Sequence, residues 1–452
     1  MPLLQRCGSA YERFFSVSEI RSEIRLQLYF GASLFFYFII FYIWLNFPTI
    51  TVENAKGGNA VCWPYFQDCY KLFFYHNTSV DDSRGIFYMA LFVIMITIAW
   101  SMWSARWRLA HALLVLLFLW EAIVIGVLAY STASPIYYYH LILTGILLFI
   151  PHKEFFLKLT FVFLYFLSAT IKFDMGWIAG TYFSTLKSGL PFVPHTLIPI
   201  ATNIIIFSQV VGCWFLLSRR LYVQRAAFYF FTTFHIYSSI LIFYLFPAAV
   251  IPPLLIFFGP LYRYTALPFS RTAIAGWTLI LVLAVFQLLG FITPGDRRMT
   301  LEGNKFGMFM FEANHQCIAT VTTYRSASTT PRSFEMPMGT SCGSPYCRVK
   351  ETVTQRGDIS VSEDRYESGG PSTRCDPYEW WSKLVRHCEL DATIERVALT
   401  FDHSINGGPF YRMVDTTDVC ALSYKMFRHN EWIRIPPEAP VVGYPVTNVE
   451  RD

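Results

Sequence analysis

Uninterrupted apolar runs dominate the first two thirds of the chain. A helix of about 20 apolar residues crosses the roughly 30 Å of bilayer hydrocarbon. Runs near that length lie at 27–47, 86–103, 109–130, 135–151, 156–172, 196–217, 226–246, 248–262 and 273–293. The pattern predicts an α-helical polytopic membrane domain of about nine spans over residues 27–293, of which the fourth, fifth and eighth are short or interrupted by proline.

The residues before the first run have a different pattern. Residues 10–25 mix Phe and Ile with Arg and Glu at helical spacing, which is typical of a helix that lies on a membrane surface. The run that begins near Gln27 has no A-x-A-like cleavage site, so we expect it to stay in place as a signal anchor. We therefore predict an interfacial segment on the cytoplasmic side over residues 1–26.

The remainder, residues 294–452, alternates short apolar and polar runs. The ranges 306–311 and 317–324 have the alternation that predicts β-strands. Residues 325–377 are rich in Ser, Thr, Gly and Pro, and we expect mostly loop there.

A hairpin is predicted near the end of this region. Its strands are residues 394–401 and 410–414, and Asn406-Gly407 between them tolerates the positive φ that such a turn requires. The membrane domain is therefore expected to be followed by a small, mostly β, disulfide-bearing exoplasmic domain.

Basic residues set the expected orientation, because Lys and Arg gather on the cytoplasmic side of membrane proteins. A cytoplasmic N-terminus puts most of those near the predicted spans on that side: Arg13, Arg21, Arg25, Arg106, Arg108, Lys153, Lys158, Arg219, Arg220, Arg225, Arg263 and Arg271. We expect a multi-pass protein of the endoplasmic reticulum or of a bacterial cell envelope, with the C-terminal domain lumenal or exoplasmic.

The cysteines agree with this orientation. Two lie in the first outer loop and six in the C-terminal domain: Cys62 and Cys69, then Cys317, Cys342, Cys347, Cys375, Cys388 and Cys420. Both sets are even and are placed where disulfides form and persist, whereas Cys7 and Cys213 are expected to be free thiols. Zinc is the alternative for Cys342 and Cys347, but no second pair of matching spacing follows, so we expect no metal.

Composition narrows the expected partners. The chain is 54% hydrophobic and 15% charged, and its net charge of +5 comes with basic residues at the ends of apolar runs. This distribution indicates a lipid bilayer as a partner and no nucleic acid.

Four ionisable residues fall inside the predicted spans, where a charged side chain is costly. They are Glu121, His140, Lys172 and His235. In the expected topology the first three lie in the outer half of the membrane and could line one cavity. A purely structural role stays open for each: Lys172 can reach the interface from the end of its span, Glu121 can pair with a nearby Arg or Lys, and a single His can simply pack.

Five short stretches, in order along the chain, carry a family resemblance. They are Tyr139-His140, Phe163 to Gly180 (FLYFLSATIKFDMGWIAG, with Lys172 and Trp177), Phe234-His235, Phe306 to Cys317 (ending His315-Gln316-Cys317) and Leu399 to Asn406 (ending Ser404-Ile405-Asn406). Together they resemble the vitamin K-dependent gamma-glutamyl carboxylases, whose wider relatives are the horizontally transferred transmembrane domain proteins. Two positions depart from the family pattern: Tyr139 replaces an asparagine and Cys317 replaces a histidine.

The resemblance implies a membrane-embedded, quinol-dependent enzyme that couples hydroquinone epoxidation to carboxylation of a glutamyl residue in a secreted or membrane peptide. Reduced vitamin K or menaquinol, with O2 and CO2, would be the cofactor and co-substrates. Lys172 matches the base that deprotonates the hydroquinone, and His140 matches a histidine that assists it. The remaining candidates are assigned to cofactor binding (Glu121, Trp177 and His235) and to substrate binding (His315, Ser404 and Asn406).

A second class of function stays open. A non-catalytic membrane protein that binds a lipid or a secreted peptide, in maturation or immunity, would keep the fold and the aromatic residues. Such a protein would not need an amine base, so replacement of Lys172 separates the two classes.

Overall fold

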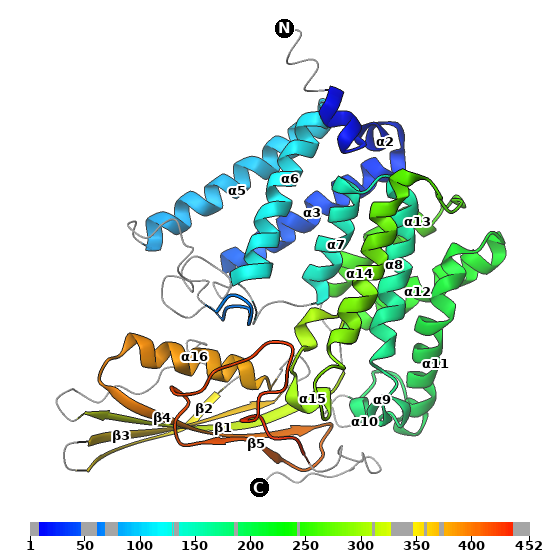
Figure 1. The fold of residues 1–452 in the computed structure, drawn as a ribbon. Helices are drawn as coiled ribbons and strands as arrows, with labels where there is room; N and C mark the ends of the chain where they lie inside the picture. Colours follow the sequence, from blue (N-terminus) through cyan, green and yellow to red (C-terminus); the bar gives the residue numbers. More distant parts are fainter. Residues whose placement is uncertain are drawn as a thin grey trace. The chain divides into compact units, whose positions relative to one another are not determined.

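The computed structural model describes residues 9–46, 61–67, 80–128, 130, 135–184, 189–241, 245–309, 312–326, 347–356, 359–369 and 375–436. The chain divides into two compact units (Figure 1). The helical unit comprises Met1–Lys56, Leu72–Thr170 and Phe207–Val285. The sheet unit comprises Gly57–Lys71, Ile171–Ile206 and Phe286–Asp452. Each unit is described by itself below.

Most of the chain before the sheet is helical. The α-helices in order are α2 (Val17–Ser22), α3 (Ile24–Asn46), α5 (Val80–Trp103), α6 (Trp107–Ile123), α7 (Pro135–Phe149), α8 (Lys153–Thr170), α9 (Met175–Ile178), α10 (Thr181–Ser184), α11 (Ile198–Val210), α12 (Leu221–Leu241), α13 (Leu245–Phe258), α14 (Ile274–Leu289) and α15 (Arg297–Thr300). A π-helical turn, Val124–Leu128, extends α6, and a 3-10 turn, Gly212–Leu217, follows α11. Aspartate side chains cap the N-termini of two short helices: Asp174 caps α9 and Asp296 caps α15.

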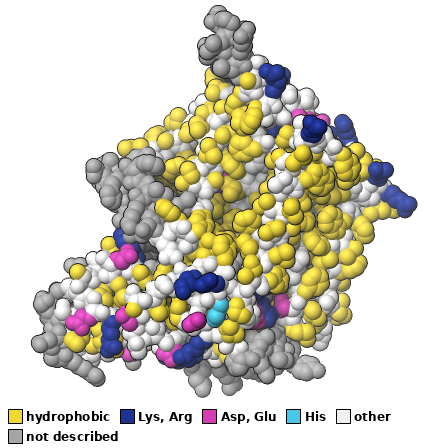
Figure 2. Space-filling view, in the orientation of Figure 1, with side chains coloured by type: hydrophobic (Ala, Val, Ile, Leu, Met, Phe, Trp, Pro, Cys, Tyr) yellow, Lys and Arg dark blue, Asp and Glu magenta, His cyan; other side chains and the backbone are white. Residues whose placement is uncertain are grey.

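Four segments are long and apolar enough to cross a membrane: Ile24–Ile43, Gly85–Trp103, Trp107–Gly126 and Arg271–Leu289. Three shorter apolar helices accompany them, at Pro135–Phe149, His195–Val210 and Phe246–Phe258. Hydrophobic side chains cover much of the visible face of the helices in Figure 2. These features are those of a membrane protein, because such surface is stable only against lipid or another apolar partner.

The predicted count of nine spans is not supported. Each predicted range coincides with a helix, but within the described residues only four reach the required length and hydropathy. The fifth range shows why: its helix, α8, is 18 residues long, but it begins with Lys153-Glu154 and carries Lys158, so it is more polar than its apolar end indicated. The pattern of apolar residues predicts a buried helix as readily as a membrane-spanning one.

The sheet unit contains one antiparallel sheet of five strands in the order β2-β3-β1-β4-β5. The strands are β1 (His315–Ser326), β2 (Cys347–Arg356), β3 (Ile359–Gly369), β4 (Ile394–Ile405) and β5 (Tyr411–Thr416). Burial alternates residue by residue along β1, as expected for a strand with one face against a core. Helix α16 (Pro377–Leu390) covers part of the sheet in Figure 1 and begins with Asp376 as its cap and proline in its first turn.

The predicted hairpin is confirmed. Strands β4 and β5 pair in antiparallel register, and both Asn406 and Gly407 have positive φ, at 51° and 71°. The strand predicted at 317–324 is likewise confirmed as the central part of β1.

Two other predictions for this region are wrong. The range 325–377 was expected to be mostly loop, yet its described part consists largely of β2 and β3, whose Ser, Thr, Glu and Arg residues gave no apolar signal. The range 306–311 was expected to be a strand, but within its described part Phe306 ends a 3-10 turn. The backbone N–H of Met308 there donates to Gln287 Oε1 at 2.7 Å instead of to a neighbouring strand.

Disulfides cross-link the sheet unit. Cys317 on β1 is bonded to Cys375 just before α16, and Cys388 on α16 is bonded to Cys420 after β5. Cys62 is also disulfide-bonded. Cys213 is a buried free thiol, as predicted. The other expected pairings involve Cys69, Cys342 and the side chain of Cys347, and Cys7 was the second expected thiol; these lie outside the described part of the chain.

Removing the disulfide from β1 should destabilise the sheet unit. The double variant Cys317→Ser/Cys375→Ser opens a loop of 58 residues, for which chain entropy predicts a loss of about 4 kcal/mol. Cys388→Ser/Cys420→Ser opens a loop of 32 residues and should cost slightly less. Denaturant titration of the purified chain in lipid nanodiscs measures both, and unchanged midpoints would contradict the assignment.

Candidate functional site

The eight candidate residues fall into both units. Three belong to the helical unit: Glu121, His140 and His235. Five belong to the sheet unit: Lys172, Trp177, His315, Ser404 and Asn406. All eight are buried, with at most 5% of any residue exposed.

In the helical unit the structure brings Glu121 and His140 together. His140 Nδ1 lies 3.0 Å from Glu121 Oε1 and 3.1 Å from Oε2. The hydroxyl of Tyr37 donates to Oε2 at 2.7 Å. The carboxylate of Glu121 therefore pairs with a histidine and a tyrosine, and not with the Arg or Lys that a purely structural role suggested.

The second nitrogen of His140 also faces oxygen atoms. His140 Nε2 lies 3.2 Å from Ser33 Oγ and 3.3 Å from the Ser33 carbonyl, and Ser33 Oγ lies 2.8 Å from Thr144 Oγ1. Ser33 and Tyr37 are four residues apart on α3, as are His140 and Thr144 on α7, so each helix presents one polar stripe. Because acceptors face both ring nitrogens, the site can hold an imidazolium paired with the Glu121 carboxylate, without net charge.

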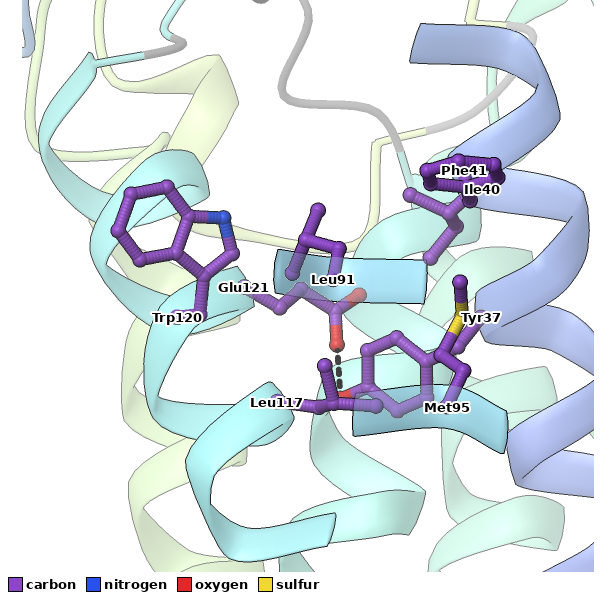
Figure 3. Close-up of a pocket in the computed structure, with 8 residues that line it drawn as sticks. All are labelled: Tyr37, Ile40, Phe41, Leu91, Met95, Leu117, Trp120 and Glu121. Carbon is purple, nitrogen blue, oxygen red and sulfur yellow. Dashed lines mark hydrogen bonds between the residues drawn. The ribbon is translucent and has the colours of Figure 1, made fainter. Parts of the chain in front are cut away.

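A small hollow opens beside Glu121 (Figure 3). Helices α3, α5 and α6 line it with Tyr37, Ile40, Phe41, Leu91, Met95, Leu117, Trp120 and Glu121. The free space in this hollow is about 10 Å³, which is about the room that one water molecule needs. Trp120 contributes a buried indole N–H with no acceptor among the described residues. Because small-molecule sites usually measure about 300–1,000 Å³, the hollow as it stands is too small for a ligand.

His235 lies elsewhere in the helical unit. Its Nε2 is hydrogen-bonded to the hydroxyl of Tyr165, and its ring is 5.8 Å from that of Phe246. No described contact joins it to the Glu121–His140 pair. The predicted cofactor role of His235 therefore stays a prediction, and its geometry is that of a packed histidine held by one tyrosine.

In the sheet unit, Lys172 is the second residue after the end of α8 and lies outside the four spans. Its Nζ is 5.2 Å from the ring centre of Trp177, and that ring stacks on Tyr182 at 5.2 Å and 22°. Burial lowers the pKa of Lys172 to about 7, although the charge of Glu312 acts in the opposite direction. A substantial fraction of neutral amine is therefore available near pH 7.

The turn after Lys172 is fixed by charge. Asp174 Oδ1 accepts hydrogen bonds from the Gly176 backbone and from Arg298 Nη1, each at 2.7 Å. Arg298 also forms an ion pair with Asp296 at 2.6 Å. This clamp positions Trp177, which follows Gly176 in α9, against the lysine.

Asn406 reaches the same turn from the end of β4. Its side-chain Oδ1 accepts a hydrogen bond from the Asn314 backbone N–H at 2.9 Å, and the backbone N–H of Asn406 donates to the Asn314 carbonyl at 2.8 Å. These two hydrogen bonds orient the amide so that Nδ2 lies beside Gly176, where a Cβ would overlap it. Asn406 Nδ2 is buried and has no acceptor among the described residues, so it is a donor available to a ligand. Ser404, by contrast, donates to the Gly408 carbonyl at 2.7 Å and has a structural role in the hairpin.

His315 lies on β1 against a second histidine. Its Nδ1 is 2.9 Å from His403 Nε2, and its Nε2 is 3.9 Å from Glu312 Oε1. His403 Nδ1 lies 3.0 Å from the Met299 carbonyl. The substrate role predicted for His315 stays a prediction.

Sequence reasoning missed several partners in these sites. Tyr37, Ser33 and Thr144 are ordinary in apolar helices, and only their spacing of four residues from one another or from His140 signals a shared face. Glu312 precedes His315 by three residues, close enough along the chain for the two side chains to meet. His403 was within a quoted stretch but was not selected, since its neighbour on β1 depends on strand register.

Metal ligation has no candidate within the described ranges. No group of three or more His, Cys, Asp or Glu side chains is arranged there to hold an ion. The candidate sites are therefore built from acid–base and hydrogen-bonding groups.

Comparisons of the chain with protein-family models, with curated proteins and with solved structures give no match.

Removing the Glu121 carboxylate should destabilise the helical unit. Glu121→Leu leaves the buried Tyr37 hydroxyl and His140 Nδ1 without their acceptor, at a cost of about 1–3 kcal/mol for each group. Glu121→Gln keeps an acceptor oxygen and should lose less. Denaturant titration of the chain in nanodiscs measures the change, with the exposed Glu395→Leu as control. Equal stability of Glu121→Leu and Glu121→Gln would show that the carboxylate pairing contributes little.

Proposed function

We propose that the chain is a membrane-embedded enzyme that uses Lys172 as a base on a hydroquinone and so drives modification, by carboxylation, of a glutamyl peptide. The observation that carries the proposal is the buried amine of Lys172, held over the face of Trp177. The resemblance of five short stretches to gamma-glutamyl carboxylases supplies the reaction class.

The amine has the properties that the proposed step needs. A general base works best when its pKa is near the ambient pH, and burial lowers the pKa of Lys172 to about 7. The neutral amine accepts the proton of a phenolic hydroxyl, and the ammonium that forms lies where the Trp177 ring and the Glu312 charge stabilise it.

The residues beside Lys172 fit an aromatic diol. Trp177 and Tyr182 form a stacked aromatic wall. Asn406 Nδ2, which lies beside Gly176 in the turn that carries Trp177, is a buried donor for an oxygen atom of the bound molecule. Reduced vitamin K or menaquinol, when bound, supplies the reducing power and, with O2, the strong base that removes the glutamyl γ-proton before CO2 adds. Lys172 starts this sequence by taking one proton; the aromatic wall excludes water from the amine.

The Glu121–His140 pair has a supporting role in this proposal. It is a preorganised, hydrogen-bonded pair of a carboxylate and an imidazole among apolar helices.

The proposed topology has a cytoplasmic N-terminus and an exoplasmic or lumenal sheet unit. Its support is the placement of basic residues at one set of helix ends and the disulfides of the sheet unit, which require an oxidising compartment.

Lys172→Met should abolish quinol oxidation. The purified chain in lipid nanodiscs is incubated with reduced vitamin K or with menaquinol, and quinone epoxide is followed by chromatography. Methionine keeps the length and the packing of the lysine stem while it removes the base, so the loss should exceed about 100-fold, the usual lower range for general-base catalysis. The exposed Lys425→Met is the matched control and should keep full activity.

Epoxide from Lys172→Met at the wild-type rate would overturn the proposed base. No epoxide from well-folded wild-type protein, with or without a glutamyl peptide, would instead favour a non-catalytic protein that binds a lipid or secreted peptide.

The oxidation rate should rise with pH through about 7. Because burial depresses the pKa of Lys172 to about 7, roughly a tenth of the amine is neutral at pH 6 and roughly nine tenths at pH 8. We therefore expect an increase of about tenfold in kcat/KM between these two pH values. A rate profile that is flat across this range would exclude Lys172 as the group whose deprotonation limits the reaction.

A further inference from the structure

The sheet unit contains the end of a candidate membrane span. The segment Arg271–Leu289 is long and apolar enough to cross a bilayer, and its residues from Phe286 onward belong to the sheet unit. Phe291 and Ile292, which follow it, are each 57% exposed, and the guanidinium carbon of Arg297 lies 3.9 Å from the ring centre of Phe291. Aromatic and basic residues at the end of a span are typical of the lipid headgroup layer. The bilayer surface is therefore expected near residue 291.

Residues 302–308 pack against the end of this span. The backbone N–H of Met308 donates to Gln287 Oε1 at 2.7 Å. A Cβ on Gly303 would lie only 3.3 Å from the carbonyl oxygen of Leu289, the last residue of the span. The segment that carries Glu302 is therefore held where the span ends.

Glu302 fastens a loop from the end of the described chain to this segment. Its buried carboxylate accepts hydrogen bonds from the backbone N–H and from Nδ2 of Asn430, each at 2.9 Å, and lies 2.8 Å from His429 Nδ1. Asn430 Oδ1 in turn accepts from the backbone N–H of Lys425 at 2.7 Å, which closes residues 425–430 into a loop. These contacts hold the loop beside the end of the span.

The loop presents Phe427 in an unusual backbone conformation. Its φ is 60°, in the left-handed region that bulky residues rarely adopt. Its ring centre lies 5.1 Å from that of Phe306, yet Phe427 stays 47% exposed, and the next residue, Arg428, is exposed as well. A strained conformation persists only where the surrounding structure holds it, and such positions are frequent where a residue has a binding role.

A second aromatic side chain extends the same surface. Trp63 is buried with its ring centre 5.6 Å from that of Phe306, and Tyr65, which is 50% exposed, stacks on Trp63 at 5.7 Å and 22°. Gln67 Nε2 donates to the Tyr424 carbonyl at 3.2 Å, so this segment is also joined to the start of the loop. Half-exposed aromatic rings beside a basic residue suit a membrane–water interface, where one side of the ring meets acyl chains and the other meets water.

We propose that Tyr65, Phe427 and Arg428 form a lipid-contacting surface, by which the sheet unit binds phospholipid headgroups where the span Arg271–Leu289 ends. The two rings enter the boundary between headgroups and acyl chains, and Arg428 pairs with a lipid phosphate. Continuity with the end of the span favours the bilayer as the occupant of this surface over a peptide or a second copy of the chain. The inference goes beyond the proposed enzyme activity and does not depend on it.

Fluorine NMR of the full chain in phosphatidylcholine–phosphatidylglycerol nanodiscs tests this surface. A trifluoromethyl-phenylalanine replaces Phe427 in one sample, which keeps the ring, and Tyr65 in a second sample. A nitroxide on the upper acyl chain of added lipid should remove most of the signal intensity at either position. A water-soluble gadolinium chelate should remove little of it.

Val353 is the control position for this label. It is 45% exposed on the edge strand β2, and its partner on β3, Ser362, pairs with Thr323 of β1. At about 3.3 Å per residue, Thr323 lies roughly 26 Å along β1 from His315, whose neighbour His403 contacts α15. The label at Val353 should therefore lose intensity to the gadolinium chelate and not to the lipid nitroxide.

Arg428→Glu tests the charge of the surface. Lipid phosphates repel a carboxylate, so the Phe427 label should lose less intensity to the lipid nitroxide and more to the chelate. The change should be larger with phosphatidylglycerol than with phosphatidylcholine alone, because the former adds negative charge. Arg365→Glu, at an exposed position on β3, is the matched control and should change neither loss. An unchanged nitroxide effect in Arg428→Glu would overturn the role assigned to Arg428.

Two results would overturn the proposed surface. One is loss of intensity at Phe427 and Tyr65 to the soluble chelate alone, as at Val353. The other is loss to neither reagent, which would show that protein covers the surface, such as a bound peptide or a second copy of the chain. Labelled chains are compared only where their denaturation midpoints equal that of the wild type, so unfolding does not account for either result. None of these measurements needs quinol, so they are separate from the test of enzyme activity.

Discussion

Burying an ionisable side chain is the constraint on which the sites of this protein depend. An unpaired charge in an apolar interior is far less stable than in water, so each buried group must find a partner or lose its charge. Glu121 meets this demand with His140 and Tyr37, across three helices. Asp174 meets it with Arg298, which at the same time fixes the turn that follows Lys172. The need to pair buried charges therefore determines both the local structure and the chemistry of these sites.

The sequence predicted helices well and strands unevenly, for physical reasons. Apolar runs locate helices wherever these pack, but length and hydropathy separate spans from shorter buried helices, and α8 with its polar first turn is the clearest example. The hairpin of β4 and β5 was predictable because Asn406-Gly407 determines its turn locally. Strands β2 and β3 were not, because their side chains are mostly polar and the pairing of β3 with β1 is non-local.

The candidate site residues likewise divide into those that could be predicted from the sequence and those that could not. Glu121, His140 and Lys172 could be selected because a titratable group in an apolar run is rare. Their partners could not be selected, because a tyrosine such as Tyr37 is common in apolar helices. The contact between His315 and His403 could not be predicted either, because it requires the register of β1 against β4. The aromatic wall of Trp177 and Tyr182 likewise depends on the turn between α9 and α10, where Gly180 has a positive φ.

The disulfide between Cys317 and Cys375 begins two residues after His315. Disulfides form and persist in oxidising environments, so the strand that carries His315 receives its cross-link only when this part of the chain meets such an environment. Assembly of the region around His315 is thereby tied to the place and time of oxidation. A newly made chain in a reducing environment lacks this restraint on β1, which couples completion of the site to the maturation of the protein in the cell.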